Sequence, residues 1–289
     1  MNTAVEHYCV PASLDEAAAV LHGGEVTILA SGTDLMPQLQ AGRARFARVL
    51  MNIRRIPELH GIGLEQGGIR IGALTTVTEL MRNEVIRGHL PVLVEACDHF
   101  ASDQLRNAAT IGGNICNASP AGDLLVPLLV VDAAVELVSK PDGARESRAV
   151  PLREFFTGPG KTVRKASELL SQVRVPLPPK GFMARFYKFG TRPALDISAI
   201  SIGLGCVREG ATLSHVRVAF GAVAPTPMRA PKTEAELEGR TLTEATIAAA
   251  AKIAREEVRP ISDVRASEWY RRELIHNLTK RVLSDVAAT

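Results

Sequence analysis

The sequence has few aromatic residues and no concentration of positive charge. Phe, Trp and Tyr make up 4% of its 289 residues, and the formal net charge is +3 without any block of Lys and Arg. Proteins that bind nucleic acids use aromatic platforms to stack bases and basic surfaces to contact phosphates. The sequence therefore predicts that nucleic acid is not the partner of this protein.

Cysteine and histidine are too scattered for a metal site. The four cysteines, Cys9, Cys97, Cys116 and Cys206, form no CxxC pair, and the seven histidines form no HxH or HExxH arrangement. Zinc sites and iron–sulfur clusters are typically bound by closely spaced residues of these types. We expect no metal on this chain and interpret the cysteines as small, reduced, buried thiols.

No apolar run is long enough to span a membrane, because charged residues interrupt the longest one. Residues 1–7 include Glu6 and lack the apolar core of a signal peptide. Together with the isolated cysteines, these absences predict a cytoplasmic protein. The chain is long enough for two domains, each with a core of its own.

The most unusual stretch is 110–123, TIGGNICNASPAGD, which fits neither an amphipathic helix nor an alternating strand. Gly112 and Gly113 allow the backbone to approach another group closely. Ser119 and Asp123 stand where side chains cap a helix, just before an apolar run. Free amides at a helix start bind anionic oxygens, above all phosphate. The stretch predicts a loop that meets a phosphate-bearing ligand, although such a Gly-Gly pair is more often a simple turn.

A second loop of interest lies at 29–35. A β-type run, EVTILA, leads into SGTD and then into the helix-like LMPQL. A strand, a glycine turn and a helix in this order direct amides and hydroxyls toward one point. Taken alone, the loop is more simply a strand–helix connection with Thr33 or Asp34 as the helix cap.

Periodicity and turn residues predict a mixture of helices and strands along the chain. Strands are expected at 25–30, 48–52, 68–71, 134–139, 169–175, 182–189, 198–208 and 212–222. Helices are expected at 13–21, 91–100, 123–131, 151–156, 233–237, 243–258 and 267–286. The segment 156–161, FTGPGK, lacks the pattern of a phosphate loop, and we interpret it as a flexible loop. Strands followed by helices in the last third indicate an α+β arrangement.

Together, the two loops resemble those of the FAD-binding, medium subunit of the molybdenum hydroxylase family, which includes xanthine dehydrogenase, carbon monoxide dehydrogenase and aromatic acyl-CoA reductases. Residues 110–123 match the family's TIGGN loop and the small residues that end in Asp. The first loop resembles its AGG- or SGG-like loop, with Ser31 in place of a glycine and Thr33-Asp34 in place of His-Ser. The later segments 169–171, 186–188, 196–198 and 220–229 also match in order and spacing, so the resemblance covers nearly the whole chain.

The resemblance implies an α+β fold with two domains. Residues 1–177 would form a PCMH-type FAD-binding domain with two lobes, at about 1–55 and 56–177. Residues 178–289 would form a C-terminal domain of the carbon monoxide dehydrogenase flavoprotein type, with a three-stranded antiparallel sheet and helices. This is not a Rossmann fold, and the sequence has no GxGxxG.

The resemblance also implies which residues bind FAD. The two glycine loops would hold the pyrophosphate and the ribityl chain, Asp123 would accept hydroxyl groups, and Lys188 would stabilise reduced anionic flavin. Tyr187 and Asp196 are expected near the flavin without a defined role. No acid–base pair is assigned, because the flavin carries the redox chemistry. The predicted cofactor-binding residues are Leu29, Ala30, Ser31, Gly32, Thr33, Asp34, Leu35, Leu74, Thr110, Ile111, Gly112, Gly113, Asn114, Ser119, Asp123, Leu170 and Lys188.

By the same resemblance, the chain is the electron-transfer subunit of a larger enzyme. Its FAD would accept electrons from the [2Fe-2S] clusters of a small subunit and pass them to an external acceptor: NAD, a quinone, oxygen or a ferredoxin. A large molybdopterin-binding subunit would oxidise the substrate and determine its identity, and a dimer of heterotrimers is the expected assembly. Two alternatives stay open: a stand-alone flavin-binding redox module, and a protein of the same fold that binds no flavin.

Overall fold

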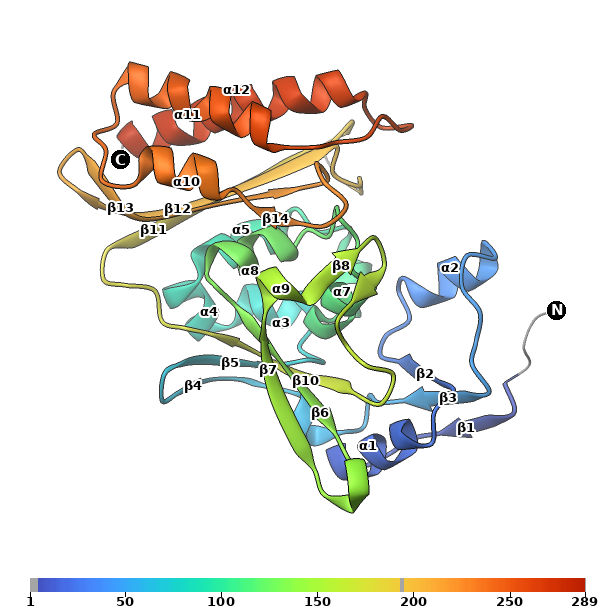
Figure 1. The fold of residues 1–289 in the computed structure, drawn as a ribbon. Helices are drawn as coiled ribbons and strands as arrows, with labels where there is room; N and C mark the ends of the chain where they lie inside the picture. The colour runs from blue at the N-terminus through green and yellow to red at the C-terminus, as the bar shows by residue number, and fades with distance from the viewer. Residues whose placement is uncertain (1–4, 193–194, 289) are drawn as a thin grey trace.

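The computed structural model describes residues 5–192 and 195–288. Within these residues the strands form three larger sheets and one short hairpin. Figure 1 shows a small N-terminal sheet at one end of the molecule, a central sheet, and a C-terminal sheet covered by helices. No helix in the described ranges combines the length and the apolar character needed to cross a membrane.

The N-terminal sheet is parallel, in the order β1-β3-β2. It consists of β1 (His7–Cys9), β2 (Val26–Leu29) and β3 (Val49–Asn52), with the helices α1 (Leu14–His22) and α2 (Leu35–Gln40) in the connections. Strand β2 ends at Leu29, so residues 30–34 connect it directly to α2. The first glycine loop is therefore placed at the end of a strand, as the sequence predicts.

The central sheet has five antiparallel strands in the order β4-β5-β10-β6-β7. Its strands are β4 (Ile62–Glu65), β5 (Gly68–Gly72), β6 (Ala134–Ser139), β7 (Glu146–Pro151) and β10 (Leu169–Val175). Six short helices lie between β5 and β6, and a seventh follows β7: α3 (Val77–Arg82), α4 (Glu84–His89), α5 (Pro91–Asp98), α6 (Asp103–Arg106), α7 (Ile111–Asn117), α8 (Leu125–Val130) and α9 (Leu152–Phe155). The helices α5 and α8 lie between the central and C-terminal sheets, so one apolar core joins both parts (Figure 1).

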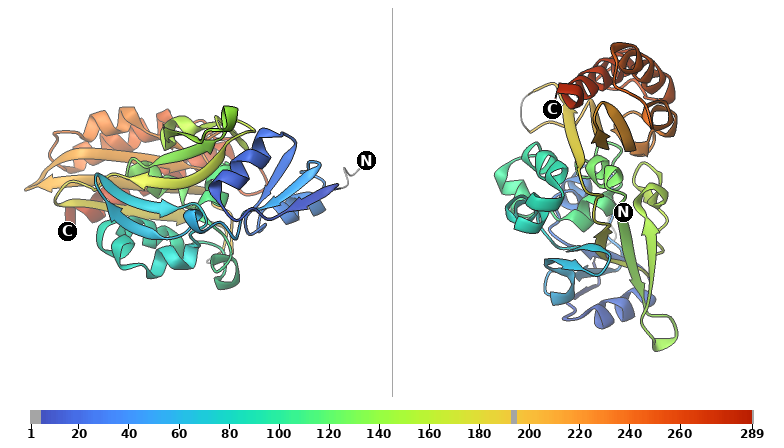
Figure 2. Two further views of the ribbon diagram at one scale, coloured as in Figure 1. Left: turned by 90° about the horizontal axis from the view of Figure 1, so that it is seen from below. Right: turned by 90° about the vertical axis from the view of Figure 1, so that its left-hand side faces the viewer.

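The C-terminal sheet is antiparallel and carries helices on its outer face (Figure 2). It consists of β11 (Phe182–Phe189), β12 (Ile200–Glu209), β13 (Thr212–Gly221) and the two-residue β14 (Met228–Arg229). The covering helices are α10 (Pro231–Leu237), α11 (Glu244–Glu257) and α12 (Glu268–Ala288). Apolar residues of these helices and of the sheet form a second core. The three long strands and three helices predicted for this region are confirmed, and β14 adds a fourth strand.

Several predictions from the sequence are wrong or incomplete. Residues 111–117 form the helix α7 rather than a loop, because Thr110 caps the helix by accepting the N–H of Gly113. The segment 156–161 is not an irregular loop but part of a hairpin of β8 (Phe156–Gly158) and β9 (Lys161–Thr162). Strands β1, β4 and β7 were not predicted, and β7 is mostly exposed and polar, which hides the strand alternation.

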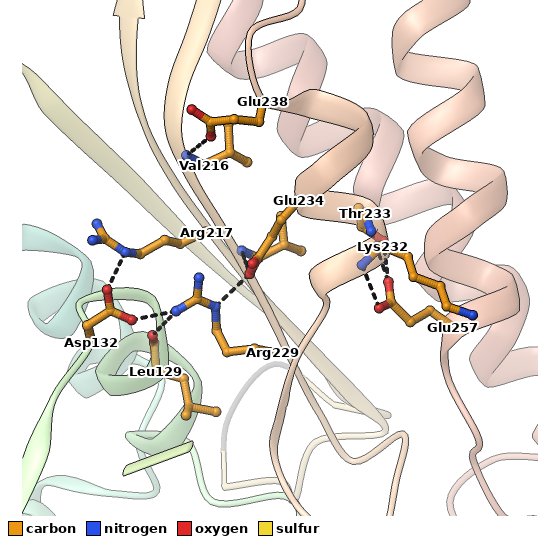
Figure 3. Close-up of polar contacts among 11 residues, drawn as sticks. Leu129, Asp132, Val216, Arg217, Arg229, Lys232, Thr233, Glu234, Glu238 and Glu257 are labelled. Atoms are coloured by element: carbon orange, nitrogen blue, oxygen red, sulfur yellow. Dashed lines mark hydrogen bonds and ion pairs between the residues drawn. The ribbon is translucent and has the colours of Figure 1, made fainter. Parts of the chain in front are cut away.

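Acidic side chains of α10 cover the part of the β13 edge that β14 leaves open (Figure 3). Glu238 accepts the N–H groups of His215 and Val216, and Glu234 accepts that of Val218. An open strand edge is a template for pairing with another chain. These carboxylates satisfy the backbone donors of the edge and remove that hazard.

Asp132 connects the central part of the chain to this sheet (Figure 3). Its two carboxylate oxygens lie 2.5 Å from Arg217 of β13 and 2.5 Å from Arg229 of β14. Arg229 also donates to Glu234 at 2.6 Å and to the carbonyl oxygen of Leu129. Because these side chains are mostly buried, loss of one charge leaves its partners without compensation.

We predict that Asp132→Asn lowers the free energy of unfolding by about 1–3 kcal/mol, since hydrogen bonds to charged groups contribute on this scale. Asparagine tolerates the left-handed backbone at this position, where φ is 52°. Thermal and urea unfolding measure the effect. Glu236→Gln is the matched control, because it also removes one negative charge, here from α10. The side chain of Glu236 has no hydrogen bond or ion pair within the described residues. Equal stability of the two variants contradicts the prediction.

Candidate cofactor site

The two glycine loops meet at a cavity of about 360 Å³. Residues 30–35 form one wall, α7 forms the opposite wall, and Leu74 and Leu170 add apolar surface. This volume lies in the range of small-molecule sites. The cavity is lined by these predicted residues: Ala30, Ser31, Gly32, Thr33, Asp34, Leu35, Leu74, Thr110, Gly112, Gly113, Asn114 and Leu170.

Two further hollows continue this cavity. One of about 290 Å³ shares Thr33, Asp34 and Asn114 with it and reaches Ser119 and Asp123. Another, of about 360 Å³, shares residues 195–196 with the second hollow and reaches Lys188. Neighbouring hollows share wall residues, and we call the three together the cleft.

Leu29 and Ile111 are the predicted residues that do not line this cleft. Leu29 is the last residue of β2, and Ile111 is fully buried in the core. Further residues line the cavity but were not predicted, and of these Cys116 and Asn117 lie one turn beyond Gly113 on α7. Helical spacing would have identified them if 111–117 had been recognised as a helix. Phe100 and Arg164 also line this cavity without having been predicted, as do His99, Phe189 and Arg192 in the hollow beside Lys188.

The first loop has backbone donors that the protein does not use. Among the described residues, no hydrogen-bond acceptor contacts the N–H groups of Ser31, Gly32 and Thr33. Gly32 has φ of 77°, and a side-chain Cβ there would lie 3.1 Å from atoms of Leu29 and Met36. The loop thus needs glycine for its shape, and this shape leaves three consecutive amides available to an anion.

The second loop is different, because the amides of residues 111–114 already have acceptors in the protein. Ile111 and Gly112 donate to the carbonyl oxygens of Thr75 and Ala73, at 3.0 and 2.9 Å. Gly113 and Asn114 donate to the hydroxyl and carbonyl oxygens of Thr110, at 3.1 and 3.0 Å. The amides of residues 111–114 therefore all have acceptors within the protein, unlike those of Ser31, Gly32 and Thr33.

Gly112 allows close packing of α7 against the rest of the chain. A Cβ at Gly112 would lie 2.8 Å from both the Cβ and the carbonyl oxygen of Ala73, in the turn after β5. The glycine thus lets α7 pack directly on this turn. The Oδ1 atom of Asn114 is the one buried side-chain polar atom of the second loop that has no partner within the described chain. A ligand hydroxyl or N–H would satisfy this acceptor.

Lys188 and Asp123 form a buried ion pair at the far end of the cleft. Lys188 Nζ lies 2.7 Å from Asp123 Oδ2 and donates to the carbonyl oxygen of His99, and Ser198 donates to Asp123 Oδ1 at 2.9 Å. Burial raises the pKa of Asp123, and the ion pair with Lys188 opposes this shift. Lys188 is thus compensated and contributes no unpaired positive charge to the cleft.

Other expectations for this end of the cleft are only partly met. Neither Ser119 nor Asp123 caps α8, which begins without a side-chain cap; Ser119 accepts the N–H of Ala121 instead. Tyr187 points away from the cleft and donates to Asp285 of α12 at 2.5 Å. Asp196 does line the cleft, where it accepts hydrogen bonds from Thr191.

These features fit an extended ligand with an anionic centre. The free amides of the first loop suit a diphosphate, the buried oxygen of Asn114 suits a hydroxyl or N–H donor, and Leu74 and Leu170 suit a flat ring. No group of three or more His, Cys, Asp or Glu side chains that could hold a metal ion occurs in the described part of the chain.

Comparisons with known proteins agree with this geometry. Residues 3–178 match the family model described as the FAD binding domain in molybdopterin dehydrogenase, and residues 185–286 match the CO dehydrogenase flavoprotein C-terminal domain. The xanthine dehydrogenase FAD-binding subunit of Escherichia coli O157:H7 is 38% identical over 266 residues, which cover 91% of this chain and 89% of the relative.

Solved structures give the same result over the whole chain. Carbon monoxide dehydrogenase from Hydrogenophaga pseudoflava superposes with a TM-score of 0.90 at 32% identity, covering 97% of this chain and 96% of the other. Quinoline 2-oxidoreductase from Pseudomonas putida 86 superposes with a TM-score of 0.90 at 27% identity, covering 100% and 99%. The chain therefore belongs to the family of FAD-binding flavoprotein subunits of molybdenum hydroxylases.

Proposed function

We propose that this chain carries the FAD of a multi-subunit molybdenum hydroxylase and binds it along the cleft between the two glycine loops. The bound FAD supplies the redox chemistry, accepting electrons from the [2Fe-2S] clusters of a small subunit and delivering them to an external acceptor. The observation that carries the proposal is the row of free amides at Ser31, Gly32 and Thr33, in residues that line the same cavity as α7.

Each part of the cleft has a role in this proposal. The first-loop amides donate to the diphosphate, and Asn114 accepts a hydrogen bond from the sugar or ribityl hydroxyls. Leu74 and Leu170 pack against a ring, and the paired Lys188 and Asp123 lie at the flavin end.

We further propose a division into domains at residues 1–177 and 178–289. The family models support it, since one ends at residue 178 and the next begins at residue 185. Under this division the flavin end of the cleft is shared: Asp123 comes from the first domain, while Lys188 and Ser198 come from the second.

The partners in this proposal are a large molybdopterin-binding subunit and a small iron–sulfur subunit, assembled as a dimer of heterotrimers in the cytoplasm. Two relatives support the presence of partner subunits: an FAD-binding subunit of xanthine dehydrogenase, and a carbon monoxide dehydrogenase medium chain that is 32% identical. The four cysteines are unpaired, which fits a reducing compartment.

Purification of a tagged chain from its native host tests the assembly. Recovery of yellow protein with two further subunits, carrying molybdenum and iron, supports the proposed enzyme. Recovery of a yellow monomer favours a stand-alone flavin module, and a colourless chain that takes up no added FAD contradicts both.

We predict that Asn114→Ala weakens FAD binding about 10-fold, which corresponds to the loss of one hydrogen bond to the ligand. Stability of the protein without FAD should stay near that of wild type, because the Oδ1 atom has no protein partner. Asn114→Asp should weaken binding further, since it places a carboxylate beside the diphosphate. Flavin fluorescence titration measures the affinity, and wild-type affinity in Asn114→Ala contradicts the assigned role.

We predict that Lys188→Met lowers the free energy of unfolding by about 3 kcal/mol or more, because it leaves the buried Asp123 carboxylate without its cation. The double variant Lys188→Met/Asp123→Asn should recover most of this loss, since asparagine is neutral and still accepts the Ser198 hydrogen bond. Chemical unfolding of the three proteins without FAD measures the coupling. Equal destabilisation of the single and double variants argues against the ion pair.

A further inference from the structure

Arg164 is the one basic side chain that lines the cavity between the glycine loops, within the described residues. It comes from the turn between β9 and β10, outside both loops. Its Nη1 atom donates to the carbonyl oxygens of Lys165 and Glu168, at 3.1 and 2.6 Å. No acceptor among the described residues contacts its Nε or Nη2 atoms. The guanidinium is thus anchored on one side, and its other donors are unused.

A buried carboxylate holds this turn in place. Glu168 is 3% exposed and binds Arg148 through both oxygens, at 2.6 and 2.9 Å. Glu168 also accepts the N–H of Lys165 at 2.7 Å, and Arg148 donates to the carbonyl oxygen of Val163. These bonds fix the backbone on both sides of Arg164, so the position of its side chain is organised before any ligand binds.

The surroundings of Arg164 are suited to a flat ring. Leu169 and Leu170 follow it in the chain and line the same cavity, with Leu74 and Cys116. Cys116 lies near the end of α7, so Arg164 and the end of this helix line the same cavity. Lys188 belongs to a hollow at the other end of the cleft. Planar guanidinium groups stack on aromatic rings in sites of this kind.

We propose that Arg164 binds the adenine ring of the cofactor and makes the site selective for FAD over the mononucleotide FMN. This inference rests on the proposed function, in which FAD occupies the cleft. It also fixes the direction of the ligand: the adenine lies against residues 164–170, and the isoalloxazine lies toward Lys188.

Affinities of the flavin-free full chain for FAD and FMN test the assignment, measured by flavin fluorescence. Arg164→Ala should weaken FAD binding about 3- to 30-fold, the range expected for a cation on an aromatic ring, and leave FMN binding unchanged. Arg164→Lys should weaken FAD binding nearly as much, because lysine keeps the charge but not the plane. Lys165→Ala is the matched control, since Lys165 is exposed and does not line the cavity.

Three results overturn the assignment: unchanged FAD affinity in Arg164→Ala, equal weakening of FAD and FMN, or wild-type FAD affinity in Arg164→Lys. The last result would mean that the arginine pairs with phosphate through its charge alone. Thermal unfolding of each variant without flavin reports on folding. If the wild-type chain binds neither flavin, the proposed function itself fails.

Discussion

The packing of α7 against the turn at residues 73–76 is the contact on which the cleft depends. The amides of Ile111 and Gly112 bond to carbonyl oxygens of this turn, and the missing side chain of Gly112 allows the approach. The contact uses the backbone donors of the helix start, so they are not available to a ligand. The first loop has the opposite property, since its amides have no protein acceptor in the described chain. One glycine loop therefore builds the wall, and the other presents the donors.

The need to pair buried charge governs the far end of the cleft and the contact of the C-terminal sheet with the rest of the chain. Asp123 and Asp132 are largely buried carboxylates on either side of α8; Asp123 binds Lys188 of the C-terminal sheet, and Asp132 binds two of its arginines. A buried carboxylate is costly unless it is paired. These pairs favour a single arrangement of the C-terminal sheet on the rest of the chain, and that arrangement completes the cleft at Lys188.

The sequence predicted those parts of the fold whose patterns are local. The long strands and helices of the last third alternate or repeat clearly, and both glycine loops stood out by composition. Helix α7 was missed because two glycines and two asparagines mask its period, while its cap at Thr110 and its packing on Ala73 are evident only in three dimensions. Arg164 was missed for a similar reason, since only the folded turn brings it into the cavity. The pairing of Lys188 with Asp123 spans 65 residues and has no local signal.

Hydrogen exchange of the backbone amides, with and without FAD, tests the central claim most directly. We expect the amides of Ser31, Gly32 and Thr33 to exchange rapidly in the free chain and to become protected when FAD binds. Those of residues 111–114 should be protected in both states, because their acceptors belong to the protein. New protection confined to 111–114, with no change at 31–33, would contradict the account.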